Sequence, residues 1–168
     1  MTLRAFGGLI ALAVLVADQS AKVAVLLRSG EAAQNSAPLA PFLDLALRWN
    51  RGISFSLFAQ DTAVGRIILL GLTLAAIALL GWWLSNCRST LTAAGLGAII
   101  GGALGNAFDR IAHGAVVDYL DFHVLGRHFF VFNLADAAIN VGVALLLVDL
   151  AFGSRAGEEQ ATSPPGAT

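Results

Sequence analysis

The sequence predicts an α-helical polytopic membrane protein with four transmembrane helices, a small cradle of β-strands and a short interfacial helix. Of its 168 residues, 57% are hydrophobic and 12% are charged, whereas soluble domains carry about 25% charged residues. Four long apolar segments follow one another along the chain, and about 20 such residues cross a bilayer as a helix. The two longer connections contain short segments with the alternating pattern of strands.

Charge and cysteine content exclude several functions. The net charge is −1 and no basic arm or basic-aromatic patch occurs, so we expect no nucleic-acid partner. Cys87 is the only cysteine, which excludes an internal disulfide and a cysteine-based metal cluster. The three histidines form no H-E-x-x-H motif, so we expect no metal and no cofactor. They are His113, His123 and His128.

The first predicted span covers residues 3–27. A helix of this length is about 37 Å long at ~1.5 Å per residue, enough to cross a bilayer. A secretory signal peptide is the alternative, because residues 5–17 form an uncharged run behind Arg4. Apolar residues resume after Lys22, however, which favours a span. Asp18 and Lys22 interrupt the segment one helical turn apart, so they share a face near its end.

Residues 29–63 do not predict a span, because they contain the turn-forming glycine, prolines and asparagine of this part of the chain. Residues 42–49 alternate loosely between apolar and polar side chains and suit a strand on an apolar surface. Residues 50–52 (Asn-Arg-Gly) favour a turn. Residues 53–60 contain two phenylalanines and predict a short amphipathic element at the membrane interface.

The second and third predicted spans cover residues 65–84 and 89–110. The connection between them is short, so we expect antiparallel neighbours. On the third span, glycines recur every four residues and predict the close approach of another helix. They are Gly97, Gly101 and Gly105. A neighbouring stripe of the same helix carries Gly102, Asn106, Asp109 and His113.

Two short strands around a turn at Gly126 are expected between residues 112 and 132. Asn133 then favours a helix N-cap, with Asp136 at the third helical position. The fourth span covers residues 134–152, and Asn140 shares a face with Asn133 and Asp136.

We expect one integral membrane domain over residues 1–153, followed by a disordered polar tail at 154–168. With four spans, both termini lie on one side. The ends of the first and third spans and the starts of the second and fourth lie on the other side, where this topology gathers the unusual polar residues. A count of loop arginines and lysines would put the termini outside, but it includes Lys22 and Arg110, which we expect inside the site.

Asp118 and Asp136 are the predicted catalytic pair. Two carboxylates facing each other near lipid do not both ionise freely, so one pKa rises and the pair shares a proton. The charged carboxylate takes a proton from water while the neutral one donates, as in aspartic proteases. Asp136 lies in a first helical turn, where the helix dipole favours its charge. Asp109, with Arg110 beside it and Lys22 within reach, is interpreted as part of a structural ion pair.

Five sequence blocks carry a resemblance to a known family. They are DQSAK at 18–22, NRGISF at 50–55, GGALGNAFDR at 101–110, VVDYLDF at 116–122 and FNLADAAIN at 132–140. In this order and spacing they resemble the motif blocks of bacterial lipoprotein signal peptidases (signal peptidase II), over about residues 5–152. Two small departures from the usual blocks, Ala21 and Ile53, lie outside the predicted catalytic pair.

The resemblance implies an aspartyl endopeptidase of the bacterial inner membrane, with cytoplasmic termini, an extracytoplasmic strand cradle and a site near the outer leaflet. It implies cleavage of prolipoproteins just before the diacylglyceryl-modified cysteine, contact with membrane lipid, and sensitivity to the cyclic peptide globomycin. By motif match, Asp118 and Asp136 would be catalytic. The supporting residues would be Asp18, Lys22, Asn50, Gly102, Asn106, Asp109, Arg110, Asn133 and Asn140.

Other interpretations remain open at this point. Intramembrane carboxylates also mark proton-coupled transporters, although no internal repeat is visible, and an inactive family member could serve as a binding protein. Ser54 or Ser56 with a histidine could imitate a serine protease pair, but the chain lacks a nucleophile elbow. Asp18 and Lys22 form either a simple helical ion pair or a site-orienting pair. The asparagines either bridge backbone groups or act in the site.

Overall fold

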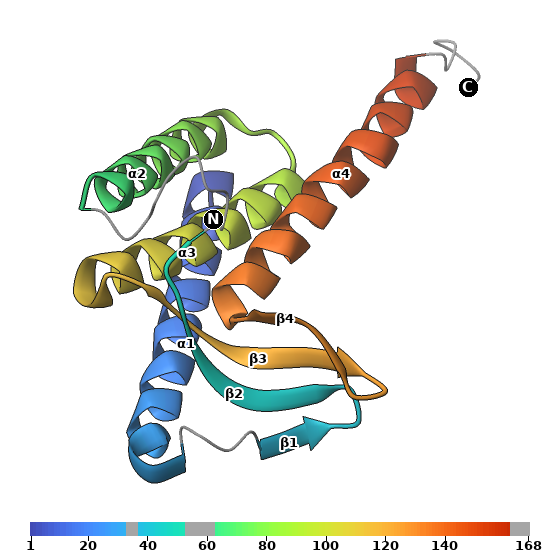
Figure 1. The fold of residues 1–168 in the computed structure, drawn as a ribbon. Helices are drawn as coiled ribbons and strands as arrows, with labels where there is room; N and C mark the ends of the chain where they lie inside the picture. The colour runs from blue at the N-terminus through green and yellow to red at the C-terminus, as the bar shows by residue number, and fades with distance from the viewer. Residues whose placement is uncertain (33–36, 53–62, 162–168) are drawn as a thin grey trace.

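Four long helices form the body of the protein (Figure 1). The computed structural model describes residues 1–32, 37–52 and 63–161. The helices are α1 (Leu3–Ala32), α2 (Ala63–Asn86), α3 (Thr90–His113) and α4 (Leu134–Ala161). Their membrane-crossing segments are Leu3–Arg28, Val64–Asn86, Thr90–His113 and Leu134–Phe152. The prediction of a polytopic membrane protein with four spans is therefore confirmed.

Helix α4 runs further than its predicted span. The apolar segment ends at Phe152, but the helix continues to Ala161, where the sequence predicted a disordered tail. Residues 155–161 are mostly Arg, Ala, Glu and Gln, which are good helix formers, so a helix can propagate past the membrane-crossing segment. Residues 162–168 of the predicted tail lie outside the described residues.

Helix α3 is the centre of the bundle. It packs against α1, α2 and α4, and 61% of its most apolar window is buried inside the protein, against 17% or less for the other helices. Glycines on two faces allow this packing, because a Cβ at Gly97 would collide with the carbonyl oxygen of Gly7 on α1, and one at Gly102 with that of Ala135 on α4. The outer faces of α1, α2 and α4 are left apolar and exposed, as lipid-facing surfaces are.

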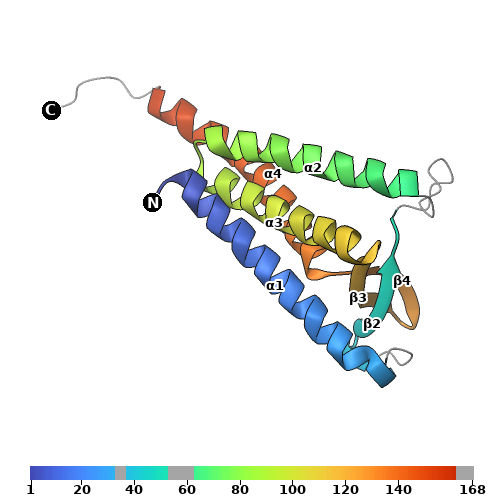
Figure 2. The ribbon, with the colours of Figure 1, turned by 90° about the vertical axis from the view of Figure 1, so that its left-hand side faces the viewer.

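A four-stranded antiparallel sheet covers one end of the bundle (Figure 2). Its order is β1 (Ala37–Ala40), β2 (Leu43–Asn50), β3 (Val116–Val124) and β4 (Arg127–Phe132). The three longer strands and the turn at Gly126, which has a φ of 77°, were predicted. Strand β1 was not predicted, because its Ala-Pro-Leu-Ala sequence has no strand periodicity. It forms by pairing with β2 at the edge of the sheet. The predicted interfacial element at 53–60 lies outside the described residues.

The sheet is joined to the bundle at two short turns, and both place polar residues next to the helix ends. Gly114 caps α3 with a φ of 73° and its N–H donates to the carbonyl oxygen of Arg110, after which the chain enters β3. Strand β4 ends at Phe132, and only Asn133 separates it from α4. Asp118 on β3 and Asp136 in the first turn of α4 are thereby carried to the same end of α3.

Candidate active site

An ion cluster of Asp18, Lys22 and Asp109 lies buried between α1 and α3. The Lys22 Nζ lies 2.7 Å from Asp18 Oδ2 and 2.7 Å from Asp109 Oδ2, and all three side chains are at most 2% exposed. Gln19 donates to one oxygen of each carboxylate, at 3.2 Å for Asp18 and 3.1 Å for Asp109. Burying charges at this depth requires such complete pairing.

Backbone groups fill the remaining positions of the ion cluster. Asp18 Oδ1 accepts from the N–H of Ala135 at 2.9 Å, and Asp109 Oδ2 accepts from the N–H of Val117 at 3.1 Å. These two bonds tie the cluster to the start of α4 and to β3. The ion cluster therefore fixes the positions of the two elements that carry Asp118 and Asp136.

The second pair of carboxylates, Asp118 and Asp136, is held by amide groups. Asp118 Oδ1 accepts from Asn133 Nδ2 at 2.7 Å and its Oδ2 accepts from Asn50 Nδ2 at 2.9 Å. Asp136 Oδ1 accepts from Asn106 Nδ2 at 2.8 Å. Within the described part of the chain, neither carboxylate makes an ion pair. We call these two residues the amide-held pair.

Asn133 and Asp136 form a reciprocal capping box, as predicted. The Asp136 N–H donates to Asn133 Oδ1 at 2.9 Å, and the Asn133 N–H donates to Asp136 Oδ2 at 3.3 Å. The cap orients both side chains. Asn133 keeps its amide group for Asp118, so the same residue that starts α4 also connects the amide-held pair.

Asn106 connects the ion cluster to the amide-held pair. Its Oδ1 accepts from Lys22 Nζ at 3.2 Å and from Asn133 Nδ2 at 3.2 Å, while its Nδ2 donates to Asp136. Lysine can only donate, so the oxygen of Asn106 must face Lys22 and its nitrogen must face Asp136. The ion cluster thus sets the direction of the hydrogen bond that reaches Asp136.

Burial raises the pKa of the Asp118 carboxyl above its ordinary value. Its amide bond from Asn50 opposes this shift and the nearby charge of Asp136 adds to it, with Asn133 and Lys22 again opposing it. The Asp118 side chain is therefore suited to hold a proton beside a second carboxylate. Burial also raises the pKa of neighbouring Tyr119 to about 12, so the phenol stays neutral and is no competing base.

Three predicted site residues have other contacts than expected. Arg110 does not pair with Asp109, because adjacent helical residues point about 100° apart and do not face each other. Its Nη1 instead donates to the carbonyl oxygen of Asn106 at 3.2 Å. Gly102 serves the close packing of α3 on α4. Asn140 is exposed and donates to the carbonyl oxygen of Asp136 at 3.0 Å.

Gln19 is the residue of this site that the sequence interpretation missed. It lies inside the DQSAK block, next to Asp18, so a signal was present. Its side chain spans from α1 to α3, donating to Gly105 and Asp109 as well as to Asp18. Over residues 1–32, 37–52 and 63–161, no group of three or more His, Cys, Asp or Glu side chains is arranged to hold a metal ion.

Comparison with known proteins gives a consistent result. A family model for signal peptidase (SPase) II matches residues 10–152. The lipoprotein signal peptidase of Beijerinckia indica is 50% identical over 157 residues, covering 94% of each chain. That of Methylobacterium sp. strain 4-46 is 46% identical, covering 93% of this chain and 94% of the relative.

Two solved structures of bacterial membrane enzymes share the fold. One superimposes with a TM-score of 0.73 at 25% sequence identity, covering 86% of this chain and 91% of the other. The second has a TM-score of 0.72 at 22% identity, covering 96% and 93%. With four membrane-crossing helices, these matches describe a multi-pass bacterial membrane protein.

Proposed function

The chain belongs to the signal peptidase II family, and on that premise we propose that it cleaves prolipoproteins with Asp118 and Asp136 as its catalytic pair. One observation carries the assignment of the pair. Asp118 and Asp136 come from different elements, meet at the end of α3, and are linked through Asn133 and Asn106. Among the residues that the structure describes, no cation is bonded to either carboxylate. Two carboxylates in such a setting can share one proton.

In the proposed reaction Asp136 is the base and Asp118 is the acid. Asp136 lies at a helix N-terminus, which favours its ionised form, and burial favours the protonated form of Asp118. Asp136 removes a proton from water as the oxygen attacks the scissile carbonyl carbon, and Asp118 gives its proton to the carbonyl oxygen. The tetrahedral intermediate then breaks its C–N bond. The amine leaves with the proton from Asp136, and Asp118 regains its own.

We assign the diacylglyceryl-modified prolipoprotein as substrate, with cleavage just before the modified cysteine. Family membership supports this assignment, and the position of the pair suits a lipid-anchored substrate. Asp136 is the third residue of a membrane-crossing segment, so the site lies within about one helical turn of the membrane surface. The peptide bond before a diacylglyceryl-modified cysteine lies at that depth, because the acyl chains of the cysteine are anchored in the bilayer.

We place the termini in the cytoplasm and the site near the outer leaflet. Lys22 does not count as a loop charge, because it is 2% exposed and bonded within the ion cluster. The remaining arginines are more numerous on the site side, and the positive-inside rule alone would place that side in the cytoplasm. Labelling of a cysteine distinguishes the two orientations. Cys87, between α2 and α3, is on the terminal side. A membrane-impermeant maleimide should label it in inverted vesicles and not in intact cells, and the reverse result would invert the topology.

Cleavage of a lipidated prolipoprotein by purified variants tests the catalytic pair. Asp118→Asn and Asp136→Asn should each lower the rate at least about 10³-fold, because the first removes the group that gives a proton to the carbonyl oxygen and the second removes the group that takes a proton from water. Asp44→Asn on β2 is the matched control and should stay within about twofold. Near-normal cleavage by a correctly folded Asp118 or Asp136 variant would remove that residue from the mechanism. Wild-type cleavage should also be blocked by globomycin and unaffected by EDTA.

A further inference from the structure

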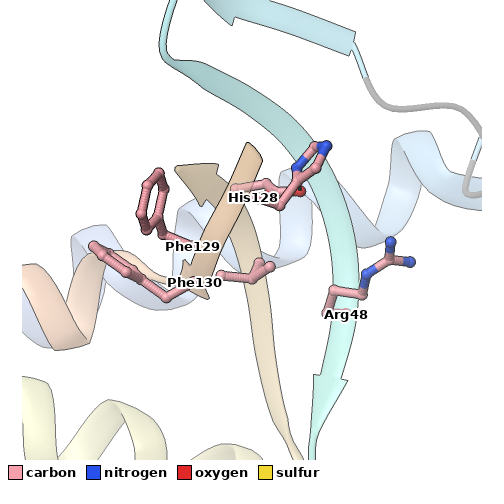
Figure 3. Close-up of a pocket in the computed structure, with 6 residues that line it drawn as sticks. Arg48, His128, Phe129 and Phe130 are labelled. Atoms are coloured by element: carbon pink, nitrogen blue, oxygen red, sulfur yellow. Dashed lines mark hydrogen bonds and ion pairs between the residues drawn. The ribbon is translucent and has the colours of Figure 1, made fainter. Parts of the chain in front are cut away.

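A pocket on the sheet is not used by the proposed reaction. Its volume is about 240 Å³. Arg48 comes from β2 and Asp121 from β3, whereas His128, Phe129, Phe130 and Val131 come from β4 (Figure 3). The pocket thus combines a guanidinium group, a carboxylate and aromatic rings. The guanidinium lacks a bonding partner among the described residues, the carboxylate has an unpaired oxygen, and the rings are exposed.

The guanidinium of Arg48 makes no hydrogen bond or ion pair within the described part of the chain. Arg48 is exposed, and its partner across the β2–β3 ladder is Asp118. Both oxygens of Asp118, however, already accept from Asn133 and Asn50. A guanidinium without a carboxylate partner is suited to a phosphate, which it can bind through two parallel hydrogen bonds.

Asp121 presents a buried acceptor that lacks a donor. Its side chain is 6% exposed, and its Oδ2 lies 2.9 Å from His128 Nδ1. Its Oδ1 is buried and, over the described residues, has no hydrogen-bond partner. Leaving a buried carboxylate oxygen unpaired is costly. A ligand that supplies N–H donors at this position would remove that cost.

The aromatic wall of the pocket is open. Phe129 is 62% exposed and Phe130 is 57% exposed. In Figure 3 both rings lie on the β4 side of the pocket, away from Arg48. Exposed phenylalanine rings with a basic residue nearby are typical of an interfacial surface, where the rings enter the boundary of the acyl chains and the cation stays among the headgroups.

The position of β4 fits that depth. Phe132 ends β4, and the membrane-crossing segment of α4 starts at Leu134. Phe130 is therefore four residues from the start of the span, at most about 13 Å along an extended chain. The headgroup layer occupies roughly 5–8 Å on each side of the hydrocarbon core, so the pocket lies at or just above it.

We propose that this pocket binds the headgroup of a phospholipid that carries a primary ammonium group. The phosphate lies on Arg48, the ammonium donates to Asp121 Oδ1, and the glycerol and first acyl carbons lie on Phe129 and Phe130. The His128 ring holds the Asp121 carboxylate in place. The site selects against a trimethylammonium headgroup, which has the same charge but no N–H donor. This inference concerns lipid at the sheet and does not depend on the catalytic assignment.

Native mass spectrometry of the full-length protein tests the proposal. The purified protein is mixed with equal amounts of phosphatidylethanolamine and phosphatidylcholine of the same acyl chains, and retained lipid is measured. The first lipid should be retained about tenfold more, the value of one charge-assisted hydrogen bond. Arg48→Gln should abolish most retention of both lipids, and Asp121→Asn should remove the preference between them. Equal retention of the two lipids by the wild type overturns the proposal.

Two controls keep the result interpretable. Arg127→Gln makes the same charge change next to His128 but outside the pocket lining, so it should leave lipid retention unchanged. If Arg127→Gln loses as much lipid as Arg48→Gln, retention depends on general surface charge and the proposal is overturned. Arg48 is exposed, so its variant should fold even where the buried Asp121 variant does not. Free O-phosphoethanolamine should compete at least about 100-fold more weakly than the lipid, because it lacks the acyl carbons. Equal competition would assign the pocket to a soluble phosphate compound.

Discussion

The ion cluster and the amide-held pair contain the same kind of acid in opposite surroundings. Asp18 and Asp109 share a lysine ammonium at 2.7 Å, whereas Asp118 and Asp136 accept hydrogen bonds from neutral amide and backbone groups. A cation bonded to a buried carboxylate compensates its charge and fixes its position. Amide donors fix the position of a carboxylate and leave its protonation free to change. The first arrangement builds structure, and the second permits acid–base chemistry.

Removing the cation should have the largest effect on stability. Lys22→Met leaves two carboxylates buried without a counter-charge, and breaking a buried pair in this way costs about 3–5 kcal/mol. Thermal unfolding in detergent should therefore show a large loss of stability. The control combines Lys22→Met with Asp18→Asn and Asp109→Asn, which removes all three charges and should restore most of the loss. If the triple variant is no more stable than the single one, the cluster is not held by charge.

The same substitution in the two clusters should act in opposite directions. Asp109→Asn removes a charge-assisted bond to Lys22 and should cost about 1.5–3 kcal/mol. Asp118→Asn should leave stability unchanged or raise it at neutral pH. The raised pKa of Asp118 means that the folded state binds more protons than the unfolded state between the ordinary and the raised value, so stability falls as pH rises through that window.

Unfolding curves at several pH values check this contrast. The wild type should lose stability relative to Asp118→Asn as pH rises above the ordinary carboxyl range, and should match it more closely in acid. A variant at Asp118 that is as unstable as the one at Asp109 would mean that both clusters are structural.

Much of the fold follows from the sequence, because the bilayer restricts the possibilities. Apolar length alone placed the four spans to within a few residues, and alternation placed β2, β3 and β4. Strand β1 has no such pattern and exists through pairing with β2. The continuation of α4 to Ala161 depends on helix propensity beyond the membrane, which is a weak signal in a polar tail.

The gathering of these polar residues at one end of the bundle was predictable from the sequence, but the contacts between them were not. The capping box at Asn133 and Asp136 is local, so spacing predicts it. The choice of Lys22 rather than Arg110 as partner of Asp109 depends on how α1 packs against α3, about 87 residues apart in sequence. For the same reason Gln19 was missed, because its donors reach across that contact.

Asn50 should tune the amide-held pair with a smaller effect. Its amide donates to Asp118 Oδ2 at 2.9 Å, which favours the ionised form and lowers the pKa of Asp118. Asn50→Ala should therefore raise that pKa further. Because Asp118 acts as the acid, the alkaline limb of the pH–rate profile should move to higher pH, with the maximum rate reduced about tenfold.

A matched amide far from the site is the control for this shift. Asn86 is the last residue of α2, at the end of the bundle opposite the sheet. Its side chain is exposed and donates to the carbonyl oxygen of Trp82. Asn86→Ala should leave the pH profile in place. A shift of the alkaline limb to lower pH in Asn50→Ala would exchange the roles of the two aspartates.

Asn140 should have the smallest effect of the predicted site residues. It shares a helix face with Asn133 and Asp136, yet its amide donates to a carbonyl oxygen of its own helix and its side chain is exposed. Substituting an exposed side chain of this kind usually changes the free energy of unfolding by less than about 0.5 kcal/mol. Asn140→Ala should therefore unfold at the same temperature as wild type, and its cleavage rate should be within about twofold of wild type. Asn133→Ala, the matched comparison, loses the cap and both amide bonds and should be strongly impaired. A tenfold or greater loss in Asn140→Ala with normal stability would instead extend the site by one helical turn along α4, to Asn140.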